Sequence, residues 1–312
     1  MFFGYNSDTR LIFLIGDPVD QAVSPLVHNT LYNYANVNAI TLPVKITEAQ
    51  LGDAVKAAKS FENIDGFVLT MPLKTSMIDY LDECDPMSRA FKCVNNILIR
   101  DNRLIGIGLD GEGMGGAIQA RLGDKLIGKH ALILGAGAVA GQIAASLCGK
   151  GVTKITIANR TVEKAAYIAD VLKGHFKGVE TTYGPLEEGF LNKAAPEADL
   201  AVQCTSMGGG TWEPFKPISF VGKLRKDCFC ADVLYPKTTF LDAAAERGLE
   251  TLHGQDMILY QQLATMEYRF GVKLPSASLH VIREALDLAV AKRTHRNSLL
   301  EKEIDPFSVL GI

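Results

Sequence analysis

The residues Gly135-Ala-Gly137-Ala-Val-Ala140 follow a short apolar run and precede a stretch with helical periodicity. A GxGxxA spacing between a strand and a helix is typical of the turn that binds the pyrophosphate of a dinucleotide. The first glycine permits a tight turn, the second lets the backbone approach the phosphates, and the helix N-terminus attracts their charge. A glycine turn without a ligand is the alternative interpretation. We predict cofactor contacts at Gly135, Ala136, Gly137, Ala138, Val139 and Ala140.

A second polar group, Asn159-Arg160-Thr161, ends the next apolar run. A site specific for NAD normally has Asp or Glu near this point, where the carboxylate binds the ribose 2′-hydroxyl. This sequence has no acid there. Arg160 offers a fork of donors and Thr161 offers a hydroxyl, and both suit a 2′-phosphate. The pattern therefore predicts NADP rather than NAD, although Thr161 would also suit the N-cap of the following helix.

These turns must be positioned by strands and helices, and the hydrophobic pattern predicts both. Stretches with helical spacing separate short apolar runs: Val139, Ile143 and Leu147 repeat at steps of four residues, and 259, 263, 266 and 270 at steps of four, three and four. This alternation predicts an α/β fold with mainly parallel sheets, and two long helices follow residue 253. Strands are expected at 11–15, 39–44, 66–69, 131–134, 154–158, 200–203 and 229–233.

The loop Thr205-Ser206-Met207-Gly208 follows the predicted strand at 200–203. In a doubly wound sheet, the carboxyl ends of the strands line the ligand crevice. Thr205, Ser206 and Met207 are therefore candidates for contacts with the nicotinamide end of the cofactor. A plain surface loop is the alternative.

Length and composition limit the possible classes of function. At roughly 150 residues per domain, the 312 residues suggest about two domains. The net charge is −3, from 32 basic and 35 acidic residues, which argues against nucleic-acid and membrane-surface partners. No apolar window approaches the length of a membrane span. None of the six cysteines forms a CxxC, and no His or Cys pair has metal-ligand spacing, so we expect reduced thiols, no metal and a cytoplasmic location.

Several further motifs occur in a fixed order along the chain. They are Gly16-Asp-Pro18, Ser24-Pro25, Thr70-Met-Pro72-Leu-Lys74, Val94-Asn95-Asn96, Asp110-Gly111, Asp232-Val-Leu-Tyr235, and Gly254-Gln-Asp-Met257 with Gln261. Together with the cofactor motifs, this ordered set resembles the shikimate dehydrogenase family over nearly the whole chain. The resemblance implies a two-domain α/β fold: a Rossmann-type NADP-binding domain, an α/β substrate-binding domain, and a cleft between them.

The resemblance also implies an activity, the reduction of a 3-keto group on a cyclohexene carboxylate by NADPH, with Lys74 and Asp110 as the catalytic pair. The residues themselves favour this role. Lys74 follows Pro72, which suits the first turn of a helix. A helix dipole opposes a cation there and would lower the pKa of Lys74, which suits proton exchange, while Asp110 would hold the ammonium. The alternative is an exposed lysine and an N-cap aspartate.

Further contacts follow from the same resemblance. Ser24 and Tyr235 would hold the substrate carboxylate, and Thr70, Asn95 and Gln261 would bind hydroxyls or Lys74. Val233, Gly254 and Met257 would contact the cofactor. The alternatives are an N-cap for Ser24 and an exposed helix position for Gln261. His28 is expected to be structural.

Four places depart from the family pattern. Ala22 replaces a serine, Val68 replaces an asparagine, Gly108-Leu109 replaces Asn-Thr, and Asn96 stands where threonine is common. Each hydrogen bond to a charged substrate that is lost in this way would weaken binding by about 1.5–3 kcal/mol. The changes at Ala22, Val68 and Leu109 therefore predict weak shikimate binding or an altered substrate.

The resemblance implies a discontinuous organisation: residues 1–111 with 253–312 form the substrate-binding domain, and residues 112–252 form the dinucleotide-binding domain. The expected partner is a small cyclic polyol carboxylate, and the expected assembly is a monomer or homodimer. Two other functions stay open. Arg160 argues against an NAD-preferring quinate- or aminoshikimate-type dehydrogenase. Lys74, Asp110 and Gln261 argue against a non-catalytic ligand-sensing paralogue.

Overall fold

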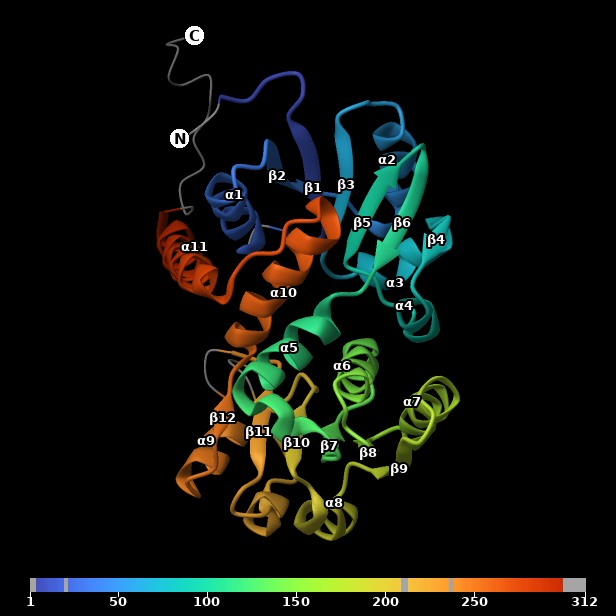
Figure 1. Cartoon of the computed structure of the whole chain (residues 1–312), viewed down its shortest axis with the longest axis vertical. Coiled ribbons are helices and arrows are strands. Elements are labelled where there is room, and N and C mark those ends of the chain that lie inside the picture. The colour runs from blue at the N-terminus through green and yellow to red at the C-terminus, as the bar shows by residue number, and fades with distance from the viewer. Residues whose placement is uncertain (1–3, 20–21, 209–212, 236–237, 300–312) are drawn as a thin grey trace. The chain divides into compact units, whose positions relative to one another are not determined.

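The computed structural model describes residues 4–19, 22–208, 213–235 and 238–299. Helices and strands alternate along most of the chain (Figure 1). The chain divides into two compact units, residues 1–73 with 274–312, and residues 74–273. None of the helices in the described ranges has the length and apolarity that crossing a membrane requires.

The first unit contains three parallel strands in the order β2-β1-β3. Strand β1 pairs with β2 from Arg10↔Ala39 to Gly16↔Lys45, and with β3 from Leu11↔Ile64 to Ile15↔Leu69. Helix α1 packs against β2 and α11. The elements are β1 (Arg10–Gly16), α1 (Ser24–Tyr34), β2 (Ala39–Lys45), α2 (Leu51–Ala58), β3 (Ile64–Leu69) and α11 (Leu279–Leu299).

The second unit begins with short elements around an antiparallel hairpin. Strands β5 and β6 pair from Asn96↔Ile107 to Arg100↔Arg103, and β4 joins β6 in parallel. Asp101 and Asn102 close the hairpin with φ values of 50° and 61°, as a two-residue hairpin turn requires. The elements are α3 (Leu73–Ser76), which begins at the boundary of the units, β4 (Glu83–Cys84), α4 (Pro86–Phe91), β5 (Asn96–Arg100), β6 (Arg103–Ile107) and α5 (Asp110–Leu122).

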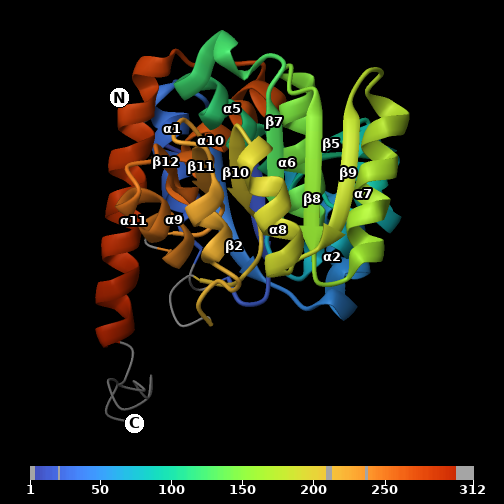
Figure 2. The same cartoon turned by 90° about the horizontal axis from the view of Figure 1, so that it is seen from below.

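A six-stranded parallel sheet follows, in the order β12-β11-β10-β7-β8-β9 (Figure 2). Counted from β7, this is the 3-2-1-4-5-6 order of the doubly wound dinucleotide-binding fold, which confirms the predicted Rossmann-type topology. The elements are β7 (His130–Leu134), α6 (Ala138–Gly149), β8 (Lys154–Asn159), α7 (Val162–His175), β9 (Glu180–Pro185), α8 (Glu188–Ala194), β10 (Leu200–Gln203), β11 (Phe229–Asp232), α9 (Thr239–Glu246), β12 (Thr251–Leu252) and α10 (Gly254–Phe270).

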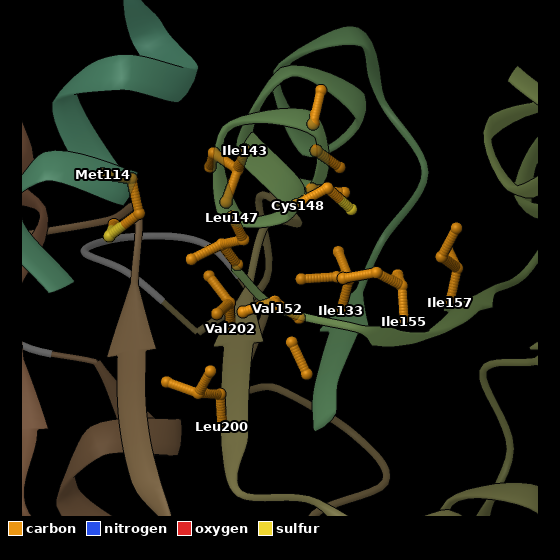
Figure 3. Packing of buried hydrophobic residues seen from close by; sticks show 14 of the residues in the cluster. Met114, Ile133, Ile143, Leu147, Cys148, Val152, Ile155, Ile157, Leu200 and Val202 are labelled. Carbon is orange, nitrogen blue, oxygen red and sulfur yellow. The ribbon is translucent and has the colours of Figure 1, made fainter. Parts of the chain in front are cut away.

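The core of this sheet explains why the strands are apolar at consecutive positions. Ile133 faces one layer, where it packs with residues of α5, α6 and α7 (Figure 3). The neighbouring residues Leu132 and Leu134 face the other layer, with residues of α8 and α9. Because helices cover both faces, alternate side chains are all buried, which gives the continuous apolar runs expected of a parallel sheet.

The predicted strands all form, and their ends agree with the prediction to within two residues. The two long helices expected after residue 253 are α10 and α11. The glycine-rich segment 111–116, which lies at the predicted boundary between residues 111 and 112, forms the first half of α5.

Candidate active site

The second unit brings Lys74 and Asp110 together. Lys74 lies in α3, and its carbonyl accepts a hydrogen bond from the Val94 N–H at 3.0 Å. Its Nζ lies 2.7 Å from Oδ2 of Asp110, the first residue of α5. The Asp110 side chain is 5% exposed and the Lys74 side chain is 21% exposed. Lys74 is therefore not the exposed lysine of the alternative interpretation, and Asp110 is not an N-cap, because Leu109 holds that position of α5.

The second carboxylate oxygen of Asp110 is held by two amides. Asn95 Nδ2 donates to Oδ1 at 2.9 Å, and Gln261 Nε2 donates to the same atom at 2.6 Å. The Leu109 N–H donates to Asn95 Oδ1 at 2.9 Å, which fixes the orientation of the Asn95 amide. We call Lys74, Asn95, Asp110 and Gln261 the lysine cluster. Gln261 on α10 is thus part of the site and not an exposed helix position.

The electrostatics of Lys74 differ from the sequence prediction. Burial lowers the pKa of Lys74, but the charge of Asp110 and the hydrogen bond to it outweigh burial, so the pKa is raised above its ordinary value. The predicted lowering by a helix dipole is therefore wrong. Helix α3 is only four residues long, and an ion pair in direct contact dominates it. Lys74 is consequently an ammonium at neutral pH and suited to donate a proton.

Close helix packing positions the cluster. Three glycines of α5 face neighbouring helices where a Cβ would not fit. A Cβ on Gly111 would lie 2.2 Å from the Gln142 carbonyl oxygen of α6, and one on Gly113 would lie 2.6 Å from the Met257 carbonyl oxygen of α10. At Gly115 it would lie 2.3 Å from Ser146 Oγ of α6. Gly113 thus lets α5 approach α10 closely enough for Gln261 to reach Asp110, and Gly111 and Gly115 let α5 pack closely on α6.

A further series of hydrogen bonds, which runs from Arg269 through Asn96, holds the Asn95 side chain. Arg269 Nε, on the buried side of α10, donates to Asn96 Oδ1 at 3.1 Å, and Asn96 Nδ2 donates to Asn95 Oδ1 at 3.2 Å. Arg269 Nη2 also donates to the Ile97 carbonyl at 3.1 Å. Sequence reasoning missed Arg269. The available signal was a cation on the apolar stripe of a long helix.

The predicted dinucleotide turn has the expected geometry. Gly135 has a φ of +109°, and a Cβ there would lie 2.9 Å from the Thr205 methyl group. Gly137 is exposed and has no neighbouring heavy atom within 4 Å of a Cβ position, so its backbone is open to a ligand. Ala140 is buried against the sheet core. The Ala136 N–H donates to Asn159 Oδ1 at 3.1 Å, which ties the turn to the end of β8.

A cavity of about 250 Å³ adjoins this turn. Its lining combines the turn with α4 and α7: Phe91, Ala136, Gly137, Ala138, Glu163, Lys164, Tyr167 and Ile168. Arg160 and Thr161 are exposed at the end of β8, and Thr161 stands at the N-cap position of α7 without a side-chain capping bond. Lys164, in the first turn of α7, lines this cavity and is a second cation, which sequence reasoning missed. An open backbone, a helix N-terminus and two cations fit a phosphorylated dinucleotide.

The loops after β10 and β11 carry the other predicted cofactor contacts. Thr205, Ser206 and Met207 follow β10, and the Met207 N–H donates to Thr205 Oγ1 at 3.1 Å. Val233, together with the predicted substrate contact Tyr235, follows β11, and both residues are half-buried. Gly254 packs closely there, because a Cβ on it would lie 2.2 Å from the Val233 carbonyl oxygen. Met257 lies one helical turn further along α10.

Comparisons with known proteins agree with this geometry. Residues 14–97 match the shikimate dehydrogenase substrate binding domain, and residues 117–211 match the shikimate / quinate 5-dehydrogenase family. A protein of Alkaliphilus metalliredigens named shikimate dehydrogenase (NADP(+)) is 34% identical over 279 residues, which cover 88% of this chain and 96% of the relative. The chain belongs to the shikimate dehydrogenase family.

Two solved structures extend the likeness. The shikimate 5-dehydrogenase of Listeria monocytogenes, solved with shikimate and NAD, is 27% identical, with a TM-score of 0.83 over 92% of this chain and 99% of that one. The 5-ketofructose reductase of a Gluconobacter strain is 28% identical, with a TM-score of 0.78 over 91% of this chain and 99% of that one. Structures similar to this chain thus include enzymes named for different substrates.

The remaining substrate candidates of this shikimate dehydrogenase family member lie in the first unit. Ser24 is the first residue of α1, with Val23 at the cap position and no side-chain capping bond. Thr70 follows β3 and is half-buried, while Val68 within β3 is buried. His28 is buried and its Nδ1 lies 3.3 Å from Thr41 Oγ1, in agreement with the expected structural role.

All six cysteines are free. Cys93 lies next to the lysine cluster, where burial and the charge of Asp110 raise the pKa of its thiol to about 12. In the described part of the chain, no group of three or more His, Cys, Asp or Glu side chains could hold a metal ion.

The departure at Gly108 has a structural explanation. A Cβ there would lie 1.8 Å from Gln142 Nε2 and 2.7 Å from the Cys93 carbonyl oxygen. Gln142, buried on α6, donates to that same carbonyl at 2.6 Å. The space that a side chain at position 108 would need is thus filled by the Gln142 side chain of α6.

Replacing Gly108 with alanine is expected to lower the free energy of unfolding by about 1–3 kcal/mol, because the added methyl overlaps the Gln142 amide and a fixed carbonyl. Thermal or urea unfolding measures this. Gly116→Ala is the matched control, since a Cβ there meets its nearest atom, in Tyr260, at an ordinary 3.6 Å. Equal stability of the two variants would contradict this packing account.

Proposed function

We propose that this chain is an NADP-dependent oxidoreductase that transfers a hydride between NADPH and the 3-keto group of 3-dehydroshikimate. The observation that carries the proposal is the lysine cluster, in which a buried carboxylate holds the Lys74 ammonium at 2.7 Å. It occurs in a chain of the shikimate dehydrogenase family that also has the dinucleotide turn.

The residues of the cluster have distinct tasks. When bound, NADPH supplies the hydride that adds to the carbonyl carbon. Lys74 donates its Nζ proton to the carbonyl oxygen, which becomes the hydroxyl, and the amine regains a proton from solvent. Asp110 stabilises the ammonium before transfer. Asn95 and Gln261 hold the other oxygen of Asp110, so that the carboxylate keeps one orientation.

The cofactor would be held at the turn and at the end of β8. Gly135, Gly137 and the N-terminus of α6 offer backbone to the pyrophosphate. Arg160, Thr161 and Lys164 offer donors for a 2′-phosphate. No acidic residue occupies positions 159–161 to bind a ribose hydroxyl, which supports NADP over NAD.

Replacing Arg160 with leucine is expected to raise the KM for NADPH about 10- to 100-fold, because a charged hydrogen bond to phosphate contributes about 1.5–3 kcal/mol. The KM for NADH should stay nearly unchanged, since NADH lacks the 2′-phosphate. Steady-state kinetics with both cofactors measures this. Arg121→Leu, at another exposed cation, is the control. Equal losses with both cofactors would argue against a 2′-phosphate contact.

We also propose the domain organisation predicted from the sequence, with residues 1–111 and 253–312 binding substrate and residues 112–252 binding the dinucleotide. The six-stranded sheet, which runs from residue 130 to residue 252, supports the second range. Free cysteines support a cytoplasmic location. The proposed assembly is a monomer or homodimer that acts on a small molecule.

A second candidate function is reduction of another polyol ketone. It is favoured by Ala22, Val68 and Leu109, which lack the polar groups usual in the family, and by the likeness to 5-ketofructose reductase. An NAD-preferring quinate- or aminoshikimate-type dehydrogenase is disfavoured by Arg160. A ligand-sensing protein is disfavoured by the intact lysine cluster.

A substrate panel distinguishes these functions. Purified protein is given NADP+ or NAD+ with shikimate, quinate or a neutral polyol, and absorbance of the reduced nicotinamide is followed. The proposal predicts the highest kcat/KM with shikimate and NADP+. A higher value with a neutral polyol would establish the second candidate, and a higher value with quinate and NAD+ would establish the quinate-type dehydrogenase. Binding of NADPH without turnover of any compound would favour the sensor.

A further inference from the structure

A fully buried carboxylate lies at the end of β11. Asp232 is 0% exposed and accepts hydrogen bonds from three segments of the chain. Gln203 Nε2 donates from 3.3 Å, the Leu234 N–H donates from 2.9 Å, and the Thr238 side chain forms the third bond. Burial raises the pKa of Asp232 to about 7, and these three hydrogen bonds oppose that effect.

Gln203 lies beside Asp232 in the register of β10 and β11 and is also 0% exposed. Its amide is directed to the loop after β10. Nε2 donates to the Met207 carbonyl at 3.0 Å and to the Thr205 carbonyl at 3.3 Å, while Oε1 accepts from the Thr205 N–H. All of the amide's hydrogen bonds therefore go to this loop or to Asp232.

The two side chains connect two loops at the carboxyl ends of adjacent parallel strands. One loop carries Thr205, Ser206 and Met207, and the other carries Val233 and Tyr235. The second loop is also bound to α10, because the Gly254 N–H donates to the Leu234 carbonyl at 3.2 Å. Helix α10 carries Gln261 of the lysine cluster. An apolar pair would fill the same space, but it would give these loops no preferred hydrogen-bonded geometry.

We propose that Asp232 and Gln203 position the nicotinamide end of the cofactor, because their buried hydrogen bonds hold these two loops in one conformation. Both side chains are fully buried, so they act through the loops and are positioning residues. This inference rests on the proposed function, because it takes the predicted cofactor contacts at Thr205, Ser206, Met207 and Val233 as given.

Asp232→Asn and Gln203→Met test the proposal. The first keeps the side-chain size but turns a donor toward the Gln203 amide, and the second keeps the volume but removes the amide. Each is expected to lower kcat about 10- to 100-fold, the scale of a misplacement near 1 Å. The dissociation constant of adenosine 2′,5′-bisphosphate, which binds only at the turn and at β8, should stay unchanged. The ratio of the affinity for NADP+ to the affinity for adenosine 2′,5′-bisphosphate should be lower in both variants than in the unaltered chain.

The matched control is Asp199→Asn. Asp199 precedes β10 at the opposite end of the strand and accepts from the His130 N–H at 3.0 Å. The Asp199→Asn variant should have a lower free energy of unfolding. The difference between its affinities for NADP+ and adenosine 2′,5′-bisphosphate should stay unchanged. Equal weakening of both ligands in the Asp232 and Gln203 variants would show a purely structural role and overturn the proposal. An unchanged kcat and an unchanged ratio of the two affinities would also overturn it.

Binding data separate this test from the test of the proposed function. If the unaltered chain turned over no substrate, the proposed function would fail, but the affinities for NADP+ and the bisphosphate would still test the positioning role. Equal affinity of the unaltered chain for both ligands would overturn that role on its own.

Discussion

Replacing Lys74 with alanine is expected to lower kcat about 10²- to 10⁴-fold, the usual contribution of a positioned acid or base. The substitution removes the group that donates a proton to the substrate oxygen. The dissociation constant of NADPH should change little, because the dinucleotide turn and Arg160 lie on other elements. Steady-state kinetics measures the first quantity, and fluorescence titration with NADPH measures the second.

Lys150→Ala is the matched control for this variant. Lys150 is also largely buried, with a side chain 14% exposed. Its Nζ lies 2.6 Å from Oε1 of Glu112, which belongs to α5, the helix that carries Asp110. Loss of that ion pair should leave kcat close to that of the unaltered chain. If Lys74→Ala turned over as fast as Lys150→Ala, Lys74 would not be the proton donor.

Replacing Asp110 with asparagine is the second substitution with a large expected effect. Burial lowers the pKa of Lys74, and Asp110 is what raises it above its ordinary value. Without the carboxylate charge the pKa of Lys74 should fall, so the ammonium should lose its proton at a lower pH. The rate of ketone reduction should then decline at a lower pH than in the unaltered chain, and its maximum should also fall.

The pH dependence of kcat/KM in the reducing direction measures this effect. Asp227→Asn is the control, because Asp227 is 66% exposed and pairs with Arg225 at the surface of the second unit. Its profile should match that of the unaltered chain. If the alkaline limb were in the same place for Asp110→Asn, the charge of Asp110 would not govern the proton on Lys74.

The sequence predicted those parts of the fold that depend on local patterns. The strands of the parallel sheet are apolar at consecutive positions because both of their faces are buried. The turn at Gly135 needs a φ of +109°, which restricts it to glycine. Lys74 and Asp110 were predicted from the family motif, and the structure brings them into contact.

Other features depend on segments that are distant in the sequence. Gln261 lies 151 positions after Asp110 in the sequence, and no local pattern around either residue predicts the hydrogen bond between them. Arg269 and Gln142 likewise act through partners on other elements. The strands β5 and β6 are short, although the Asp101-Asn102 turn between two apolar runs was a usable signal. The direction of the shift in the pKa of Lys74 was mispredicted, because the ion pair with Asp110 has a larger effect than the helix dipole.

The most direct test of the central claim is hydride transfer itself. Shikimate that carries deuterium at carbon 3 is mixed with NADP+ and the purified protein, and the reduced cofactor is analysed by mass spectrometry. The account predicts deuterium on the nicotinamide ring, formed by the unaltered chain and nearly abolished in Lys74→Ala. Reduced cofactor without deuterium, or binding of NADP+ with no reduced cofactor, would contradict it.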